Sequence, residues 1–154
     1  MEIEDILSAD RIVISLEAGS KKNALRELAG KAASKTGLEE HEIFEVLMER
    51  ERLGTTGVGS GIAIPHGKIP DLDHLFGCFA KLDNPVDFDA IDGEPVDLIF
   101  LLLAPELVGA DHLKALARIS RVLRNAAKCD KLRLAKTPER IFSLLTQEAH
   151  THAA

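Results

Sequence analysis

The longest uninterrupted apolar run of the chain, Leu98–Ala104, limits the folds that the chain can adopt. The run is far shorter than the roughly 20 residues that a membrane-spanning helix needs. Apolar residues without a polar alternation are typical of a β-strand that is buried on both faces. We therefore predict an α/β fold, in which helices cover both faces of a sheet.

Several other segments have the spacing of secondary structure that would surround this strand. Apolar residues recur with the period of an amphipathic helix in four segments, and short apolar or alternating runs predict further strands. We expect helices after Ser20 up to Gly37, over 39–52, over 112–126 behind a cap at Asp111, and from Thr137 and Pro138 onward. We expect a helical turn within 2–8 and strands over 11–16, 62–65, 74–82 and 96–104.

The spacing of these elements predicts a single domain over residues 1–154. Some predicted strands follow one another too closely for a crossover helix, so the sheet should be mixed rather than purely parallel. The chain has 154 residues, of which 45% are apolar, and this is enough for one core. The tail from about Gln147 is expected to fray.

Composition and charge exclude several classes of function. The formal net charge is −6, and a chain without Trp or Tyr offers little for stacking on bases, so we expect no nucleic-acid partner. Cys78 and Cys129 lie far apart without the spacing of a metal site, which favours reduced thiols. The N-terminus is acidic, unlike a signal peptide, and we therefore expect a cytoplasmic protein without membrane insertion.

A glycine-rich stretch followed by a histidine is the strongest candidate for a functional site. Glycines stand at positions 54, 57, 59 and 61, just before Ile62-Ala63-Ile64-Pro65-His66. Unpaired backbone N–H groups in such a loop can bind an anion, and Pro65 restricts the backbone beside the imidazole. A neutral imidazole is a competent nucleophile for a phosphoryl group near pH 7. A lone histidine beside a proline is nevertheless often a plain loop residue.

The string Gly61–Lys68, with Arg50 upstream and His112 downstream, resembles the enzyme IIA domain of the bacterial phosphoenolpyruvate-dependent phosphotransferase system, fructose/mannitol type. The run Phe88–Phe100 is similar to the nitrogen-regulatory branch of that family. The resemblance implies a mixed sheet of about five strands flanked by helices. It also implies that His66 carries a phosphoryl group, so that the chain is a phosphotransferase with a phosphohistidine intermediate, and mainly a regulatory phosphocarrier.

The resemblance also implies roles for the residues around His66. His112 would donate a ring N–H to the phosphoryl group, and Arg50 would neutralise its charge. The N–H groups of Thr56, Gly57 and Ser60, together with Lys68, are expected to bind the phosphate. We expect no metal and no cofactor. The donor would be a small histidine phosphocarrier protein, and the targets would be regulatory proteins such as potassium-transport regulators or sensor kinases.

Three alternatives remain open from the sequence. The chain could be a sugar-transport subunit that passes phosphate to a cysteine-bearing enzyme IIB, a metal-dependent hydrolase that uses His66 and His112, or an interaction module with a vestigial site. Other motifs fail on inspection. Lys68 is followed by Ile69 where a P-loop needs Ser or Thr, and His41-Glu42 lacks the second histidine of a zinc helix.

Overall fold

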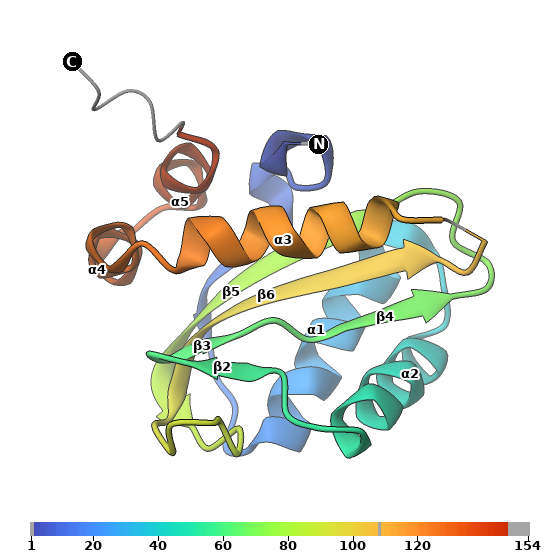
Figure 1. Cartoon of the computed structure of the whole chain (residues 1–154), viewed down its shortest axis with the longest axis horizontal. Helices are drawn as coiled ribbons and strands as arrows, with labels where there is room; N and C mark the ends of the chain where they lie inside the picture. The colour runs from blue at the N-terminus through green and yellow to red at the C-terminus, as the bar shows by residue number, and fades with distance from the viewer. Residues whose placement is uncertain (1, 108, 148–154) are drawn as a thin grey trace.

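The central strand of the sheet is β6 (Val96–Pro105) in the computed structural model, which describes residues 2–107 and 109–147 (Figure 1). Every residue of β6 except Asp97 is buried. The apolar run that dominates the sequence is thus a strand covered on both faces, as predicted. Leu98, Phe100 and Leu102 belong to one core cluster, and Ile99, Leu101 and Leu103 to the other.

The other strands flank β6 in a mixed arrangement. On one side, β5 (Phe76–Val86) runs antiparallel to β6, and β1 (Ile12–Leu16) runs parallel to β5. On the other side, β3 (Ile62–Ala63) and β4 (His66–Ile69) both run parallel to β6, and β2 (Gly57–Gly59) pairs antiparallel with β3. Within the described residues these elements form one 6-stranded mixed sheet, which confirms the predicted fold class.

An interruption separates β3 from β4, although both pair with β6 in one continuous register. The interruption lies at Ile64 and Pro65. Proline has no N–H to donate to a neighbouring strand, and the N–H of Ile64 is bonded instead to the carbonyl of Thr56, at 3.0 Å. The predicted strand over 62–65 is therefore wrong at its end, because β3 ends at Ala63. Hydrogen bonding to β6 resumes at the carbonyl of Pro65, which accepts the N–H of Leu102 at 3.0 Å.

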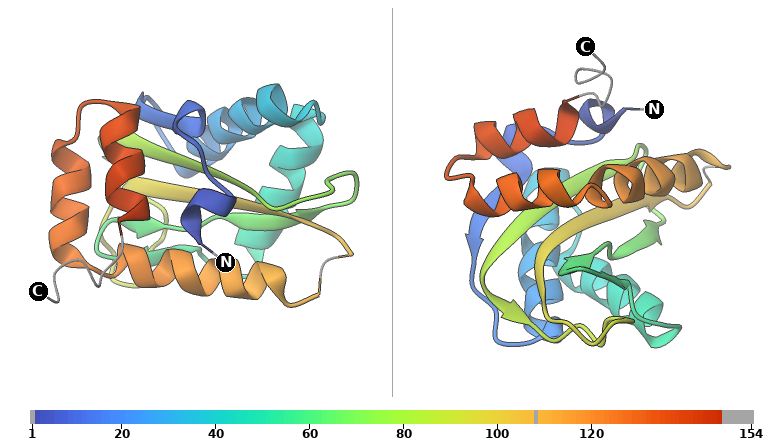
Figure 2. Two further views of the ribbon diagram at one scale, coloured as in Figure 1. Left: turned by 90° about the horizontal axis from the view of Figure 1, so that it is seen from above. Right: turned by 60° about the vertical axis from the view of Figure 1, so that its left-hand side comes forward.

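Helices cover the two faces of the sheet as two separate layers (Figures 1 and 2). The first layer packs on the core cluster that contains Leu28 and Leu47, and the second on the cluster that contains Phe100 and Ile119. The first layer consists of α1 (Lys21–Thr36) and α2 (Glu40–Arg52). The second consists of α3 (Asp111–Leu123), α4 (Ala126–Leu134) and α5 (Pro138–Thr146), with the short 3-10 turn η1 (Ile3–Asp5); a second turn, η2 (Ala9–Arg11), leads into β1.

The caps predicted from the sequence begin and end two of these helices. Ser20 accepts the N–H of Asn23 at 3.1 Å, and Thr137 accepts the N–H of Arg140 at 3.1 Å. Gly37 adopts φ 78°, the left-handed conformation that commonly ends a helix. Local chemistry alone therefore defines the two ends of α1 and the start of α5.

The long helix predicted over 112–126 is wrong at both ends. α3 begins at Asp111 behind Ala110, so Asp111 is the first helical residue and not its cap. The helix ends at Leu123, because Asn125 is extended and its side chain accepts the N–H of Lys128 at 3.0 Å to begin α4. The sequence did not predict α4, which buries only Cys129 and Leu132 and therefore lacks a clear apolar stripe.

Three remaining points concern membrane-spanning helices, the C-terminal tail and the two cysteines. No helix in the described part of the chain is long and apolar enough to cross a membrane. The predicted frayed tail lies, apart from Gln147, outside the described residues. Cys78 and Cys129 are both buried and free, and burial raises the pKa of the Cys78 thiol to about 12.

Candidate active site

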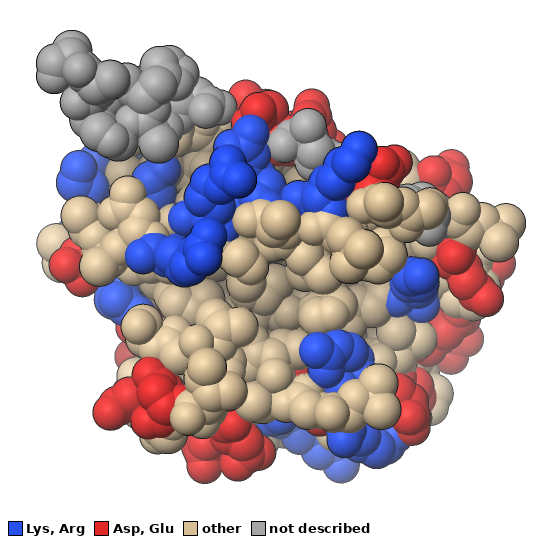
Figure 3. All heavy atoms as spheres, viewed as in Figure 1, with Lys and Arg blue, Asp and Glu red and all other residues tan. Residues whose placement is uncertain are grey.

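A pocket of about 350 Å³ opens between α2, β4 and the start of α3, and His66 lies in its wall. In Figure 3 it forms part of a mostly uncharged hollow below α3. Three of the predicted residues besides His66 line it, namely Arg50, Lys68 and His112. The other described lining residues are Val46, Glu49, Leu53, Gly67, Leu102, Ala104, Leu113 and Leu116. The fold therefore brings together Arg50, His66, Lys68 and His112, which are far apart in the sequence.

Close packing of α2 on β4 places Arg50 beside His66. His66 is the first residue of β4 and pairs with Leu102 of β6. The next residue is Gly67, and a Cβ at that position would lie 2.4 Å from Cγ1 of Val46 on α2. Only a residue without a side chain permits this approach of strand and helix.

Two neighbours hold the imidazole of His66, one on each ring nitrogen. Nδ1 lies 2.9 Å from the carbonyl oxygen of Ile64, and Nε2 lies 3.3 Å from Nε of Arg50. A carbonyl only accepts a hydrogen bond and a guanidinium only donates one. These partners therefore assign the proton to Nδ1 and leave a lone pair on Nε2, the nitrogen beside Arg50.

The surroundings of His66 also favour its neutral form. Burial lowers the pKa of His66 below its ordinary value of 6.5, and the nearby positive groups of Arg50 and His112 lower it further. The hydrogen bond to Ile64 and the negative charge of Glu51 act in the opposite direction, but the net effect is a lowered pKa. Near pH 7 the ring is consequently uncharged, as a nitrogen nucleophile must be.

Arg50 and His112 approach the pocket from two different helices. Arg50 lies in the last turn of α2, and its NH1 group donates to the carbonyl of Gly54 at 2.8 Å, which restrains the guanidinium. His112 is the second residue of α3 and is half-buried, with Nδ1 3.2 Å from the carbonyl of Gly109. Since that carbonyl takes the Nδ1 proton, His112 can donate from Nε2 only when the ring carries both protons.

The predicted phosphate-binding residues divide into two groups. Lys68 is an exposed residue of β4 and lines the pocket. Thr56, Gly57 and Ser60 are not among its described lining residues. Their N–H groups bond within the protein instead: to the carboxylate of Glu51 at 3.1 Å, to the hydroxyl of Thr55 at 3.0 Å and to the carboxylate of Asp92 at 2.8 Å, respectively.

The glycine-rich stretch has a defined backbone structure of its own. It folds into the β2–β3 hairpin, where Ser60 and Gly61 form the turn with φ of 58° and 81°. Ser60 and Gly61 provide the left-handed backbone of this turn, a conformation that glycine adopts most readily. The hairpin positions His66 only indirectly, through the strand that follows it.

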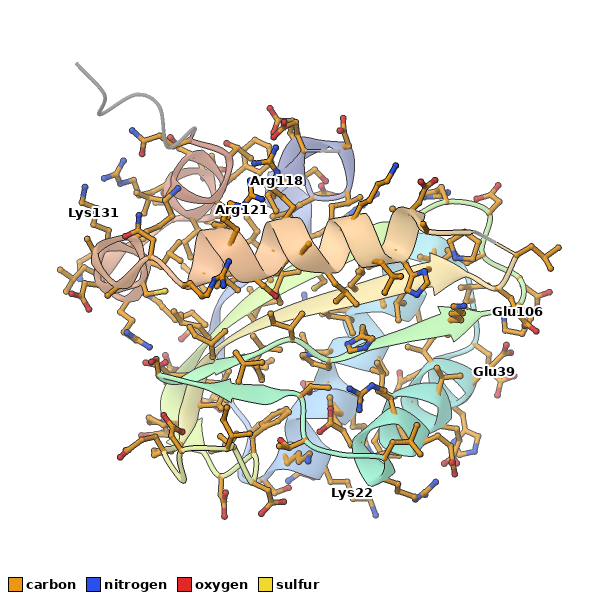
Figure 4. All side chains as sticks on the ribbon, viewed as in Figure 1. Lys22, Glu39, Glu106, Arg118, Arg121 and Lys131 are labelled. Atoms are coloured by element: carbon orange, nitrogen blue, oxygen red, sulfur yellow. The ribbon has the colours of Figure 1, made fainter. Side chains whose placement is uncertain are left out.

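On the face drawn in Figure 3, Lys and Arg gather mainly away from the pocket. Figure 4 places Arg118 and Arg121 on α3, and Lys131 on α4, where Lys and Arg gather in Figure 3. The positive groups that act on His66 are Arg50 and His112, which lie outside this area. No group of three or more His, Cys, Asp or Glu side chains in the described ranges is arranged to hold a metal ion.

Two features of the site were missed from the sequence. The rim of the pocket is apolar, with Leu53 84% and Leu113 59% exposed, although exposed leucines cannot be recognised before the fold is known. Glu51 is buried beside Arg50, whereas a glutamate at a charged helix end is ordinarily exposed. The glycine after His66 is the one local signal that could have indicated the close helix.

Comparison with known proteins agrees with this geometry. Residues 5–148 match the family described as phosphoenolpyruvate-dependent sugar phosphotransferase system, EIIA 2. The chain belongs to this family. The enzyme IIA resemblance inferred from Gly61–Lys68 is therefore confirmed at the level of the whole chain.

Proteins named as nitrogen regulators and a protein named as a fructose-specific component both match the chain. The nitrogen regulatory protein of Bradyrhizobium diazoefficiens is 55% identical over 99% of this chain and 100% of its own length. A fructose-specific EIIA component from Haloferax volcanii is 33% identical over 96% of this chain and 98% of its own. The crystal structure of the nitrogen regulatory protein IIA-Ntr from Neisseria meningitidis superposes with a TM-score of 0.89, at 37% identity, over 94% of this chain and 99% of that one.

Proposed function

We propose that this enzyme IIA protein is a phosphocarrier and a phosphorylation-dependent regulator, which accepts a phosphoryl group on Nε2 of His66. The observation that carries this proposal is the pair of contacts on the ring. The Ile64 carbonyl holds the proton on Nδ1, and the lone pair of Nε2 is therefore directed away from it, toward Arg50. The lowered pKa of His66 keeps that lone pair unprotonated near pH 7.

The donor would be a phosphohistidine on a small histidine phosphocarrier protein. The Nε2 lone pair attacks phosphorus as the P–N bond to the donor imidazole breaks, and the donor ring leaves with the bonding electron pair. Such transfers have a loose transition state in which charge gathers on the phosphoryl oxygens. Protein groups therefore contribute mainly position and opposite charge.

Arg50 is the best-placed group to supply that charge. Its Nε–H contacts Nε2 in the free protein, so a phosphoryl group on Nε2 would meet the guanidinium at once. The bond from NH1 to Gly54 keeps the guanidinium close while Nε changes partner. Lys68 adds a second cation, and doubly protonated His112 adds a donor at the N-terminus of α3, where the helix dipole also favours an anion.

A regulatory role is supported by the nitrogen regulatory relatives, which cover the whole chain at higher identity than the fructose-specific component does. The targets we propose are regulatory proteins such as potassium-transport regulators or sensor kinases. The runner-up is a sugar-transport subunit that passes its phosphoryl group to a cysteine on an enzyme IIB. A purified cysteine-bearing enzyme IIB, offered as acceptor, separates the two roles.

Intact-mass analysis after incubation with the phosphoenolpyruvate-driven cascade tests the proposal. We expect one acid-labile phosphoryl group on the wild-type protein and none on His66→Ala. His74→Ala, which changes an exposed histidine, is the matched control and should be modified like the wild type. A phosphoryl group retained by folded His66→Ala would overturn the assignment. Phosphorus NMR of the modified protein distinguishes Nε2 from Nδ1.

A further inference from the structure

Glu51 is a buried carboxylate that lies one residue after Arg50 and is not among the described residues that line the pocket. Its side chain is only 4% exposed. Lys21 of α1 places its ammonium 2.8 Å from Oε1. Thr56 donates twice, from its N–H to Oε1 at 3.1 Å and from its hydroxyl to Oε2. The charge of Glu51 is therefore paired, and both of its oxygens accept hydrogen bonds.

A continuous path of hydrogen bonds joins this carboxylate to the ring of His66. The carbonyl of Thr56 accepts the N–H of Ile64 at 3.0 Å. The carbonyl of Ile64 then accepts Nδ1–H of His66 at 2.9 Å. Ile64 belongs to the interruption between β3 and β4, so its N–H and carbonyl are available for these two bonds.

The last turn of α2 therefore reaches both nitrogens of His66. Successive residues of a helix point about 100° apart, so Arg50 and its neighbour Glu51 face different surroundings. Arg50 faces the pocket and contacts Nε2 directly, whereas Glu51 faces the interior and reaches Nδ1 through Thr56 and Ile64. One rigid element thus controls the cation and the orientation of the nucleophile together.

We propose that Glu51 is a positioning residue for phosphoryl transfer, which acts through Thr56 to hold the Ile64 carbonyl on Nδ1 of His66. The role follows from general chemistry: a group that fixes one imidazole nitrogen decides which tautomer presents its lone pair at the other. The proposal rests on the proposed function, because it concerns the efficiency of that same nitrogen as acceptor.

A purely structural role for Glu51 would give the same ion pair but a different set of contacts. Lys21 also lies 3.4 Å from the carbonyl of Phe88, so it ties α1 to the segment between β5 and β6. If Glu51 only anchored α1, its contacts would go to that helix. Apart from Lys21, the donor to Glu51 is Thr56, which donates both of the other hydrogen bonds. Thr56 is also the residue whose carbonyl accepts the N–H of Ile64.

Paired substitutions at Thr56 test one of the two hydrogen bonds by which Glu51 holds Thr56, while the Lys21–Glu51 ion pair and the backbone bonds of the path stay in place. Thr56→Val removes the hydroxyl but keeps the shape and the N–H, and Thr56→Ser restores the hydroxyl. Nitrogen-15 NMR of the imidazole reports the tautomer of His66, with His66→Gln used to assign the signals. We expect a several-fold rise of the Nε2–H tautomer in Thr56→Val and phosphorylation slower by on the order of 10-fold, as for the loss of other outer-shell partners. Thr56→Ser should match the wild type.

Glu51→Gln tests the carboxylate itself. Glutamine has an NH₂ group in place of one carboxylate oxygen, and this group would face a donor of Thr56 or Lys21 and weaken that contact. The tautomer of His66 should therefore shift as in Thr56→Val. Asp97→Asn is the matched control. Asp97 accepts Arg133 Nε at 2.8 Å and NH2 at 3.0 Å at the other end of the hairpin, so its loss disturbs an ion pair without touching the path to His66.

The outcomes separate this inference from the proposed function. A shifted tautomer in Thr56→Val, with the wild-type tautomer in Thr56→Ser and Asp97→Asn, supports it. Wild-type tautomers and rates in both Thr56→Val and Glu51→Gln overturn it, and Thr56→Val decides alone if Glu51→Gln does not fold. If the wild-type protein accepts no phosphate, the proposed function fails, but the tautomer comparison still decides whether Glu51 positions the ring.

Discussion

Val46 occupies the space that a side chain at position 67 would need, since a Cβ built on Gly67 lies 2.4 Å from Cγ1 of Val46. The contact joins α2 to β4 directly beside the site, and it places Arg50 next to the ring of His66. The positions of α2, β4 and His66 relative to one another therefore depend on Gly67. This relationship leads to the first prediction.

Gly67→Ala should move α2 away from β4 and separate Arg50 from His66. Overpacking of this kind costs about 1–3 kcal/mol of stability. A displacement of about 1 Å at the reacting groups can slow a reaction on the order of 10²-fold. Denaturant unfolding measures the first effect, and the rate of phosphorylation by the cascade measures the second.

A second substitution controls this experiment. Val46→Ala removes the methyl group that the new Cβ would meet, so the double variant Val46→Ala/Gly67→Ala should regain much of the lost rate. Equal rates for the single and double variants would show that Gly67 matters for another reason than its distance from Val46.

Arg50→Met should slow phosphorylation on the order of 10²-fold, because it removes the cation closest to Nε2. The positive charge of Arg50 lowers the pKa of His66, so the same substitution should raise that pKa in an NMR titration. Arg52→Met is the matched control, since Arg52 is an exposed neighbour that pairs with Glu49. A control that slows transfer as much as Arg50→Met would contradict a specific role for Arg50.

His112→Ala should leave His66 modifiable but slow the transfer by on the order of 10²-fold, since one donor to the developing charge is lost. The carbonyl of Gly109 holds the Nδ1 proton of His112, so donation from Nε2 needs the doubly protonated ring. Single-turnover rates of the wild type and of His112→Ala measure the effect, and an unchanged rate would argue against donation from this ring.

The lowered pKa of His66 predicts a dependence of stability on pH. Between the folded-state pKa and the unfolded value of 6.5, the unfolded chain binds a proton that the folded chain does not. The contribution of His66 to the free energy of unfolding should therefore be fully present above pH 6.5. It should be lost progressively as the pH drops from 6.5 through the lowered pKa. His66→Gln should remove this part of the pH slope in urea unfolding, whereas His74→Gln should retain it.

Phosphorylation should act as a change of surface charge and not of fold. A phosphoryl group adds about −1.5 to −2 charge at an open pocket whose walls belong to rigid elements. Amide NMR shifts should be confined to the end of α2, to β4 and to the start of α3, and His66→Asp should imitate the modified form only in part. Shifts spread through α1 and α5 would indicate refolding instead.

Local chemistry in the sequence was enough to predict much of the architecture. Ser20, Gly37 and Thr137 mark helix ends by short-range hydrogen bonds and backbone preference, and the apolar run of β6 indicates burial on both faces. The enzyme IIA motif around His66 likewise lies in one continuous stretch. Such features depend on residues a few positions apart, so one sequence displays them directly.

Contacts between distant segments were decided only by the tertiary structure. Ile64 leaves the sheet to hold His66, Gly67 admits Val46, and Glu51 is buried with Lys21 from another helix. The glycine-rich stretch forms a hairpin, in which the N–H of Ser60 bonds to Asp92, 32 positions away in the sequence. A residue's chemistry shows what it is able to bind, but only packing decides which partner comes within reach.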